Sequence, residues 1–101
     1  MNKEMTMNRS SRPEVRNPIL ALPATARLLD LPPEVRLILA QVLRDLYQDA
    51  KVRADKSWAS KKGPLAVYWK AVAVYALHIS RAVRPTRAEL RSRVVDLKVA
   101  A

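Results

Sequence analysis

The chain of 101 residues contains no cysteine, one glycine and one histidine. Without cysteine there is no disulfide framework and no thiolate metal site, and a lone histidine, His78, excludes any paired-histidine metal site. The single glycine, Gly63, excludes the glycine-rich loops that hold nucleotide phosphates, and it argues against all-β folds, which need many glycine-bearing turns. These absences leave an all-α fold of helices joined by proline and short polar turns.

The sequence also lacks the patterns that catalysis needs. No nucleophile elbow of the GxSxG type occurs, and no local motif supplies a carboxylate that would orient His78 as a general base. The acidic residues Asp45, Asp49 and Asp55 alternate with lysine and arginine, which is typical of a solvated helix face. We therefore expect a protein that is not an enzyme, with no catalytic residue, no metal and no cofactor.

Positive charge is abundant: 19 lysines and arginines stand against 9 acidic residues, and the net charge is +10. Such a balance favours an anionic partner, which can be nucleic acid, an acidic protein surface or an anionic membrane. The membrane is disfavoured because apolar and basic residues do not separate into one amphipathic helix. No apolar signal segment opens the chain, and its longest apolar run is too short to span a membrane, so we expect a cytoplasmic protein.

Composition divides the chain into two parts. Residues 1–16 are polar and predict a disordered basic arm, and residues 17–101 predict a single small helical domain. The domain opens with two short turns, one that begins at Pro18 with Asn17 as its cap and one that runs from Pro23 to about Leu29. We call these two turns the lid, because their leucines are expected to cover a larger apolar surface.

The centre of the chain predicts a long antiparallel helical hairpin. Neither proline nor glycine interrupts residues 34–62, so the first helix should span about 33–62, and the second should span about 64–84. Gly63 is the expected C′ residue of the first helix, and Gly63–Pro64 forms the tight break between the helices. The first helix is expected to face the second through a row of apolar residues, namely Val35, Ile38, Leu39, Val42, Leu46 and Ala50. The second helix is expected to pack against this row with a wide apolar face, which consists of Leu65, Tyr68, Trp69, Val72, Tyr75, Ala76, Ile79 and Val83.

The segment after Pro85 is compatible with two structures. Thr86 and Glu89 have the spacing of a capping box and predict a short C-terminal helix over about 87–99. The valine-rich run at 94–99 is also compatible with a strand. Both alternatives remain open for residues 86–101.

The second hairpin helix is apolar on nearly all sides, which is typical of a helix that is buried on more than one side. Its second apolar face predicts self-association, with two hairpins forming a four-helix-bundle dimer. The alternative is a monomer in which the lid and the C-terminal segment cover that face. The residues expected at the self-association or partner face are Ala66, Val67, Ala73, Val74 and Leu77.

Two basic clusters are the candidate anion-binding sites. One lies near the hairpin tip, where lysines hold phosphate and an aromatic ring stacks on bases; it consists of Lys56, Trp58, Lys61, Lys62 and Lys70. The other surrounds Pro85 and consists of Arg81, Arg84, Arg87 and Arg91. The alternative for both is an ordinary solvated surface, with Tyr68 and Trp69 in the core.

The sequence as a whole favours a small basic accessory or regulatory protein that binds nucleic acid, DNA or RNA, mainly through phosphate contacts. If the nucleic acid is DNA, the protein would be associated with the nucleoid. The alternative is a helical protein-interaction module, an adaptor or an inhibitor, that docks on an acidic or nucleic-acid-handling protein.

Overall fold

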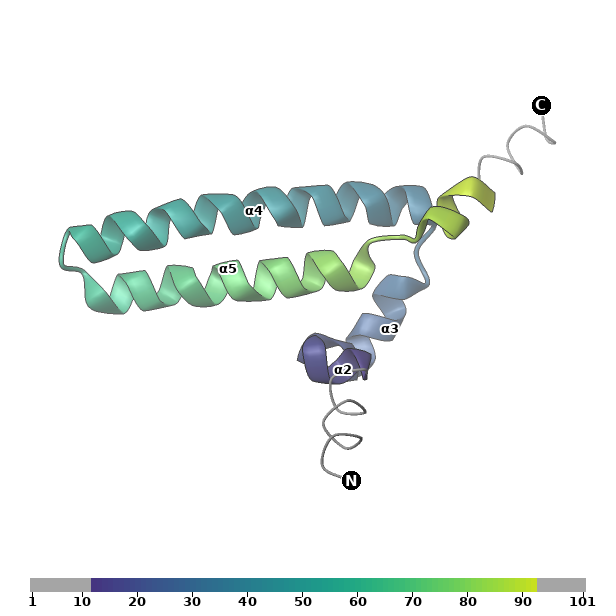
Figure 1. Ribbon diagram of the computed structural model, residues 1–101, viewed down its shortest axis with the longest axis horizontal. Coiled ribbons are helices and arrows are strands. Elements are labelled where there is room, and N and C mark those ends of the chain that lie inside the picture. Colours follow the sequence, from purple (N-terminus) through teal and green to yellow (C-terminus); the bar gives the residue numbers. More distant parts are fainter. Residues whose placement is uncertain (1–11, 93–101) are drawn as a thin grey trace, which may run out of the picture.

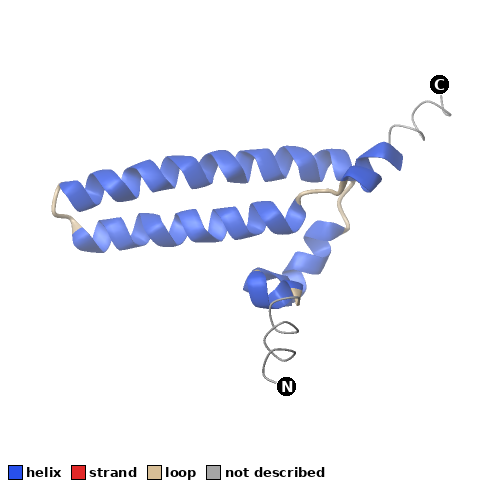
Figure 2. Ribbon diagram, in the orientation of Figure 1, coloured by secondary structure: helices blue, strands red, loops and turns tan. Residues whose placement is uncertain are grey.

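The computed structural model describes residues 12–92, and every regular element in that range is a helix (Figure 2). Two long helices, α4 (Pro33–Ala59) and α5 (Gly63–Val83), lie side by side as an antiparallel hairpin (Figure 1). The predicted all-α fold with a long helical hairpin is therefore confirmed. The first helix ends three residues earlier than expected, at Ala59 rather than Lys62.

Three short elements precede the hairpin, and a proline stands in the first turn of each. They are α2 (Pro13–Arg16), the 3₁₀-helix η1 (Pro18–Ala21) and α3 (Pro23–Leu29). Proline is favourable there because the first turn has no internal partner for its N–H groups. The helical turn of α2 corrects the expectation that the chain is disordered through residue 16; the rest of the predicted arm, 1–11, lies outside the described residues.

The lid packs against the C-terminal half of α5 (Figure 1). Asn17 does not cap η1 with its side chain as predicted. Its amide instead donates a hydrogen bond of 2.7 Å to the carbonyl oxygen of His78, and the Thr25 hydroxyl donates one of 2.6 Å to the Ile19 carbonyl. The first bond ties the start of the described chain to α5.

The contact between α4 and α5 is built from small side chains. The apolar residues buried there are Ala40, Ala50, Ala54, Ala66, Ala73 and Ala76, and each is less than 5% exposed. The hydroxyl of Ser80 donates a hydrogen bond of 2.8 Å across the contact to the backbone carbonyl of Ala40. A side chain can reach the backbone of a neighbouring helix in this way only where the two helices approach closely.

The predicted packing of the hairpin is wrong for α4 and right in part for α5. The row of large aliphatic side chains on α4 does not face α5: Ile38 is 62% exposed and Val42 is 58% exposed, and of that row only Ala50 is buried. The face predicted on α5 does enter the contact through Ala76 and Val83, which are buried, and its members Trp69, Val72 and Ile79 are half-buried, whereas Leu65, Tyr68 and Tyr75 are exposed. The large row of α4 is turned away from α5 because the helices meet along their smallest side chains.

Ala66 and Ala73 also differ from their predicted role at a partner face. They are 1% and 4% exposed, since both lie inside the hairpin contact. A partner cannot reach them without separating α4 from α5. Of the other residues predicted there, Val67 and Val74 are exposed, and Leu77 is half-buried.

At the hairpin tip, α4 ends in a C-cap whose left-handed position is occupied by a lysine. The N–H of Lys61 donates to the carbonyl of Trp58 and the N–H of Lys62 donates to that of Ser57, which is the Schellman pattern of hydrogen bonds. The residue that takes the left-handed conformation is Lys61, with φ of 60°, and not Gly63 as predicted. Gly63 instead begins α5. In this conformation the Cβ atom of lysine is strained against the backbone, whereas glycine has no Cβ atom.

Lys61→Gly is therefore expected to stabilise the protein by about 1 kcal/mol, because it relieves that strain. Urea unfolding followed by circular dichroism measures the change. Lys61→Ala is the matched control: it removes the same charge but keeps a Cβ atom, so it should bring no comparable gain. Equal stabilities of the glycine and alanine variants would contradict the strain at this position.

A buried arginine joins the two ends of the hairpin to the segment after it. Arg36 of α4 is 6% exposed, and its Nε donates a hydrogen bond of 2.9 Å to the carbonyl of Val83 at the end of α5. Its Nη1 forms a salt bridge of 2.6 Å with the carboxylate of Glu89. The guanidinium thus satisfies a carbonyl that the end of the helix leaves without an internal partner.

Glu89 belongs to a capping box, as the sequence predicted. The N–H of Thr86 donates to Glu89 Oε1 at 3.0 Å, and the N–H of Glu89 donates to the Thr86 hydroxyl at 3.1 Å. Residues 87–92 are helical, so the described part of the C-terminal segment is a helix; residues 93–99 of the predicted helix lie outside the described residues. The hydrogen bond from Thr86 and that from Arg36 lower the pKa of Glu89.

Replacing the buried guanidinium should destabilise the fold markedly. Arg36→Met leaves the Val83 carbonyl without its side-chain donor and the Glu89 carboxylate with the Thr86 N–H but no cation, and we expect a loss of about 2–3 kcal/mol. Arg44→Met on the exposed side of the same helix is the control, with a change within about 0.5 kcal/mol. Chemical unfolding of both variants measures the difference, and similar losses would show that the junction around Arg36 is not stabilising.

The lowered pKa of Glu89 predicts a dependence of stability on pH. A carboxyl group whose pKa is lower in the folded state stabilises the fold above its unfolded pKa, about 4.3, and loses this contribution as the pH falls through the folded value. Stability should therefore decline in acid, and Glu89→Gln should reduce that decline. Urea midpoints recorded from about pH 6 to about pH 3 test this; an unchanged acid profile in the variant would contradict it.

None of the helices within residues 12–92 combines the length and the apolar character that crossing a membrane requires.

Candidate nucleic-acid interface

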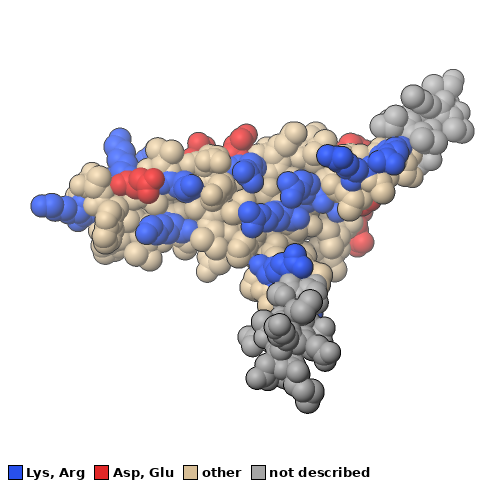
Figure 3. All heavy atoms as spheres, in the orientation of Figure 1, with Lys and Arg blue, Asp and Glu red and all other residues tan. Residues whose placement is uncertain are grey.

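Lysine and arginine side chains are distributed along one broad face of the hairpin (Figure 3). On α4, Arg44 and Lys51 flank the ring of Tyr47, with their charged groups 5.7 and 5.6 Å from its centroid. Both contacts are cation–π interactions, which hold the two long side chains on the same side of the helix. Trp58 continues this row, because it follows Lys51 by seven residues, or about two helical turns.

The row on α5 that faces the same way is also cationic. Arg84 and Arg44 line one open hollow of about 370 Å³ between the helices, together with the carboxylate-bearing Asp45. Lys70 belongs to this side as well, since its ammonium group lies 5.8 Å from the centroid of the Trp58 ring. Arg81 follows Lys70 by eleven residues, which places it on the same side of α5. We call this set the basic face; it consists of Arg44, Lys51, Trp58, Lys70, Arg81 and Arg84.

Trp58 is the aromatic residue best placed to meet a ligand on this face. Its side chain is 67% exposed although it is one of the largest in the chain. The sequence predicted Trp58, within the cluster near the hairpin tip, as the ring that stacks on bases. Its ring, with Lys70 beside it, offers a stacking surface next to a positive charge.

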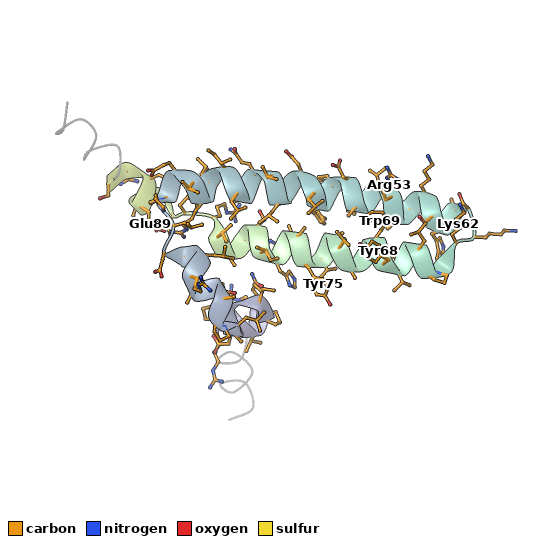
Figure 4. All side chains as sticks on the ribbon, turned by 180° about the vertical axis from the view of Figure 1, so that it is seen from behind. Arg53, Lys62, Tyr68, Trp69, Tyr75 and Glu89 are labelled. Carbon is orange, nitrogen blue, oxygen red and sulfur yellow. The ribbon has the colours of Figure 1, made fainter. Side chains whose placement is uncertain are left out.

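The other aromatic residues of the tip lie on the opposite side of the hairpin (Figure 4). Tyr68 and Trp69 pack edge to face with ring centroids 5.0 Å apart, and the guanidinium of Arg53 lies 5.9 Å from the centre of the Trp69 ring. Lys56 lines the same small hollow as Arg53 and Trp69. Lys56 is thus separated from Lys70 and Trp58, with which the sequence analysis had grouped it.

The remaining predicted cations lie at the two ends of the molecule. Lys61 and Lys62 are exposed at the hairpin tip, and Arg87 and Arg91 are exposed on the helical turns beyond the other end of α5. A helix of 27 residues such as α4 extends about 40 Å. The two predicted clusters are therefore not one compact site, but the basic face runs between them as a strip.

Arg44 and Lys51 were missing from the site residues that the sequence analysis selected. The available signal was the spacing of seven residues from Arg44 to Lys51 and again to Trp58, which places all three in one row. From the sequence alone that row is a solvated side of one helix, with no register against α5. The alignment of the two rows follows from the alanine contact, which fixes how each helix is rotated.

Two exposed valines interrupt the positive charge on α5. Val67 and Val74 are 63% and 48% exposed, and they stand three residues before and four residues after Lys70. Val74 and Arg81 are again seven residues apart, so these valines share the basic side of the helix. The face thus combines cations with a small apolar surface.

No cluster of three histidine, aspartate or glutamate side chains that could hold a metal ion occurs among residues 12–92. His78 is half-buried, and its backbone carbonyl receives the hydrogen bond from Asn17. Comparison with protein-family models, with curated proteins and with solved structures found no match.

Proposed function

We propose that this chain is a small, non-enzymatic nucleic-acid-associated accessory or regulatory protein that binds mainly through phosphate contacts along the basic face. The observation that supports this most strongly is the alignment of Arg44, Lys51, Lys70, Arg81 and Arg84 along one side of a rigid hairpin. A polyanion such as DNA or RNA presents phosphates over a comparable length, since one turn of duplex DNA is about 34–36 Å long. Displacement of counterions by such a row of cations provides affinity.

The same surface predicts binding that depends little on the base sequence of the nucleic acid. Lysine and arginine contacts to phosphate position a protein without distinguishing bases. Trp58 is the group that could contact a base, by stacking in a single-stranded region, and stacking tolerates any base. We therefore propose binding that depends strongly on salt and weakly on sequence, in the cytoplasm, by a homodimer that forms a four-helix bundle.

A second candidate is a helical protein-interaction module that docks on an acidic, nucleic-acid-handling protein. The exposure of Val67 and Val74 among the cations favours it, because protein interfaces combine an apolar centre with a charged rim. In that case charge reversal would weaken protein docking, and nucleic acid would bind only at low salt.

Charge reversal on the two sides of the hairpin distinguishes a binding face from net charge. The double variant Arg44→Glu/Lys70→Glu changes the basic face, and Arg53→Glu/Lys56→Glu makes the same change in charge on the opposite side. We expect the first to weaken binding to a labelled DNA duplex by at least about tenfold and to lower the slope of log affinity against log salt by about 2, since two phosphate contacts are lost. The second should change both quantities much less.

Fluorescence anisotropy over a range of salt concentrations measures the affinity and the slope, and circular dichroism checks that the helices remain. Equal losses in the two double variants would show that only net charge matters. Wild-type binding that disappears at physiological salt would contradict the proposed function and favour the protein-docking candidate.

A further inference from the structure

The side of the hairpin opposite the basic face is apolar, and its first half is a row on α4. Val35, Ile38, Val42 and Leu46 follow one another at three and four residues, so they share one side of the helix. Their exposed fractions run from 44% to 62%. The same row continues to Arg53, whose guanidinium lies against Trp69 of α5. This contact shows which side of the hairpin the row occupies.

The second half of the apolar side belongs to α5. Leu65 lines the same hollow as Arg53 and Trp69, so it lies on the side of the α4 row. Tyr68 follows Leu65 by three residues and Tyr75 by ten, so both lie near the side of α5 that Leu65 occupies. Figure 4 shows Tyr68 next to Trp69, and Tyr75 further along α5 on the edge that points away from α4. Together these residues form what we call the back face, which consists of Val35, Ile38, Val42, Leu46, Leu65, Tyr68 and Tyr75.

The size of the back face matches what a stable dimer buries. Its seven side chains are 43–62% exposed, and their exposed area comes to roughly 700–800 Å², close to the 800 Å² or so that each partner buries in a standard interface. A typical monomer exposes an apolar patch of about 300–600 Å² at most. A surface of this size and composition is normally covered.

The hairpin alone buries few large apolar side chains completely. Its fully buried apolar residues within 12–92 are alanines and Val83, and Val83 is the largest fully buried side chain. Larger side chains at the contact, among them Leu43, Trp69 and Val72, are half-buried, and those of the back face are exposed. Alanine burial removes little apolar area from water, whereas valine, leucine and isoleucine each contribute about 1.5–3 kcal/mol when fully buried. Every copy of the chain exposes the same back-face side chains. A second copy is therefore the partner that can bury them in every molecule.

The distribution of charge allows two back faces to meet. The cations of the basic face point away from the back face, so they are separated by the full thickness of two hairpins when the back faces are in contact. At that separation salt screens the repulsion between the two copies. The seven side chains of the back face are uncharged. The charged residues beside them, Arg53, Lys56 and Lys62, line the hollow at the hairpin-tip end together with Leu65.

We propose that two copies pair through their back faces and bury Ile38, Val42 and the neighbouring side chains in a four-helix core. The dimer would then present its two basic faces in opposite directions. Resting on the proposed function, this arrangement allows one dimer to hold two nucleic-acid segments at once and so to bridge them. The pairing surface is not the predicted one around Ala66 and Ala73, which the hairpin itself buries.

Substitution of a single exposed residue tests the pairing. Val42→Asp places a charge in the centre of the α4 row. Val52→Asp is the matched control, because it makes the same substitution at a valine that is 66% exposed but points to a different side of α4, ten residues further along. Analytical ultracentrifugation should show a dimer for the wild type and for Val52→Asp, and a monomer for Val42→Asp. A monomeric wild type, or a dimeric Val42→Asp variant, would overturn the proposal.

A measurement on the wild type covers the case in which Val42→Asp does not fold. The melting temperature of a dimer that folds as a unit rises with protein concentration, by a few degrees for each tenfold increase. The wild type and Val52→Asp should show this rise. A melting temperature independent of concentration would exclude a dimer that is coupled to folding, and with it the proposed core.

Bridging is tested separately so that the two proposals can fail independently. Beads that carry one DNA duplex are mixed with protein and with a second, labelled duplex, and recovery of the label reports bridging. The wild type and Val52→Asp should recover it, and Val42→Asp should bind DNA without recovering it. If the wild type is a dimer but binds no DNA, the back-face pairing stands and the proposed function fails. If the dimer binds DNA but never recovers the second duplex, the outward arrangement of the basic faces is wrong.

Discussion

The close approach of α4 and α5 along their alanines is the constraint on which the rest of the structure depends. Small side chains on both helices let the Ser80 hydroxyl reach the backbone carbonyl of Ala40. Once the helices meet along that line, the rotation of each about its own axis is fixed. Every larger side chain must then project to one side of the hairpin or to the other, and the two sides acquire opposite character.

This separation connects stability with function. One side gathers cations from both helices and a largely exposed tryptophan, and the other gathers large apolar side chains that the described chain does not cover. The junction around Arg36 maintains the arrangement at the open end of the hairpin, because one guanidinium holds the end of α5 and the carboxylate of Glu89. At the closed end the Schellman cap keeps the reversal tight even though a lysine occupies the left-handed position.

Several site residues could be predicted from the sequence, and others could not. Trp58 was recognised as an aromatic residue among the lysines of the hairpin tip, and the capping box of Thr86 and Glu89 was recognised from its spacing. Arg44 and Lys51 were missed, and Lys56 was grouped with Lys70, because the sequence places a residue on a helix but not on a side of the hairpin. The side depends on which residues of the other helix lie opposite, and that is a property of the packed pair.

The sequence by itself determined the all-helical fold, the two hairpin helices and the prolines that begin each short element, since these follow from local backbone preferences and from the scarcity of glycine. Only the tertiary structure decided which residues are buried. Val35, Ile38, Val42 and Leu46 have the periodicity of a core, yet Ala40, Ala50 and Ala54 occupy the contact with α5. Periodicity reports that a helix has an apolar face, whereas the closest packing between two helices is set by the smallest side chains that they can bring together.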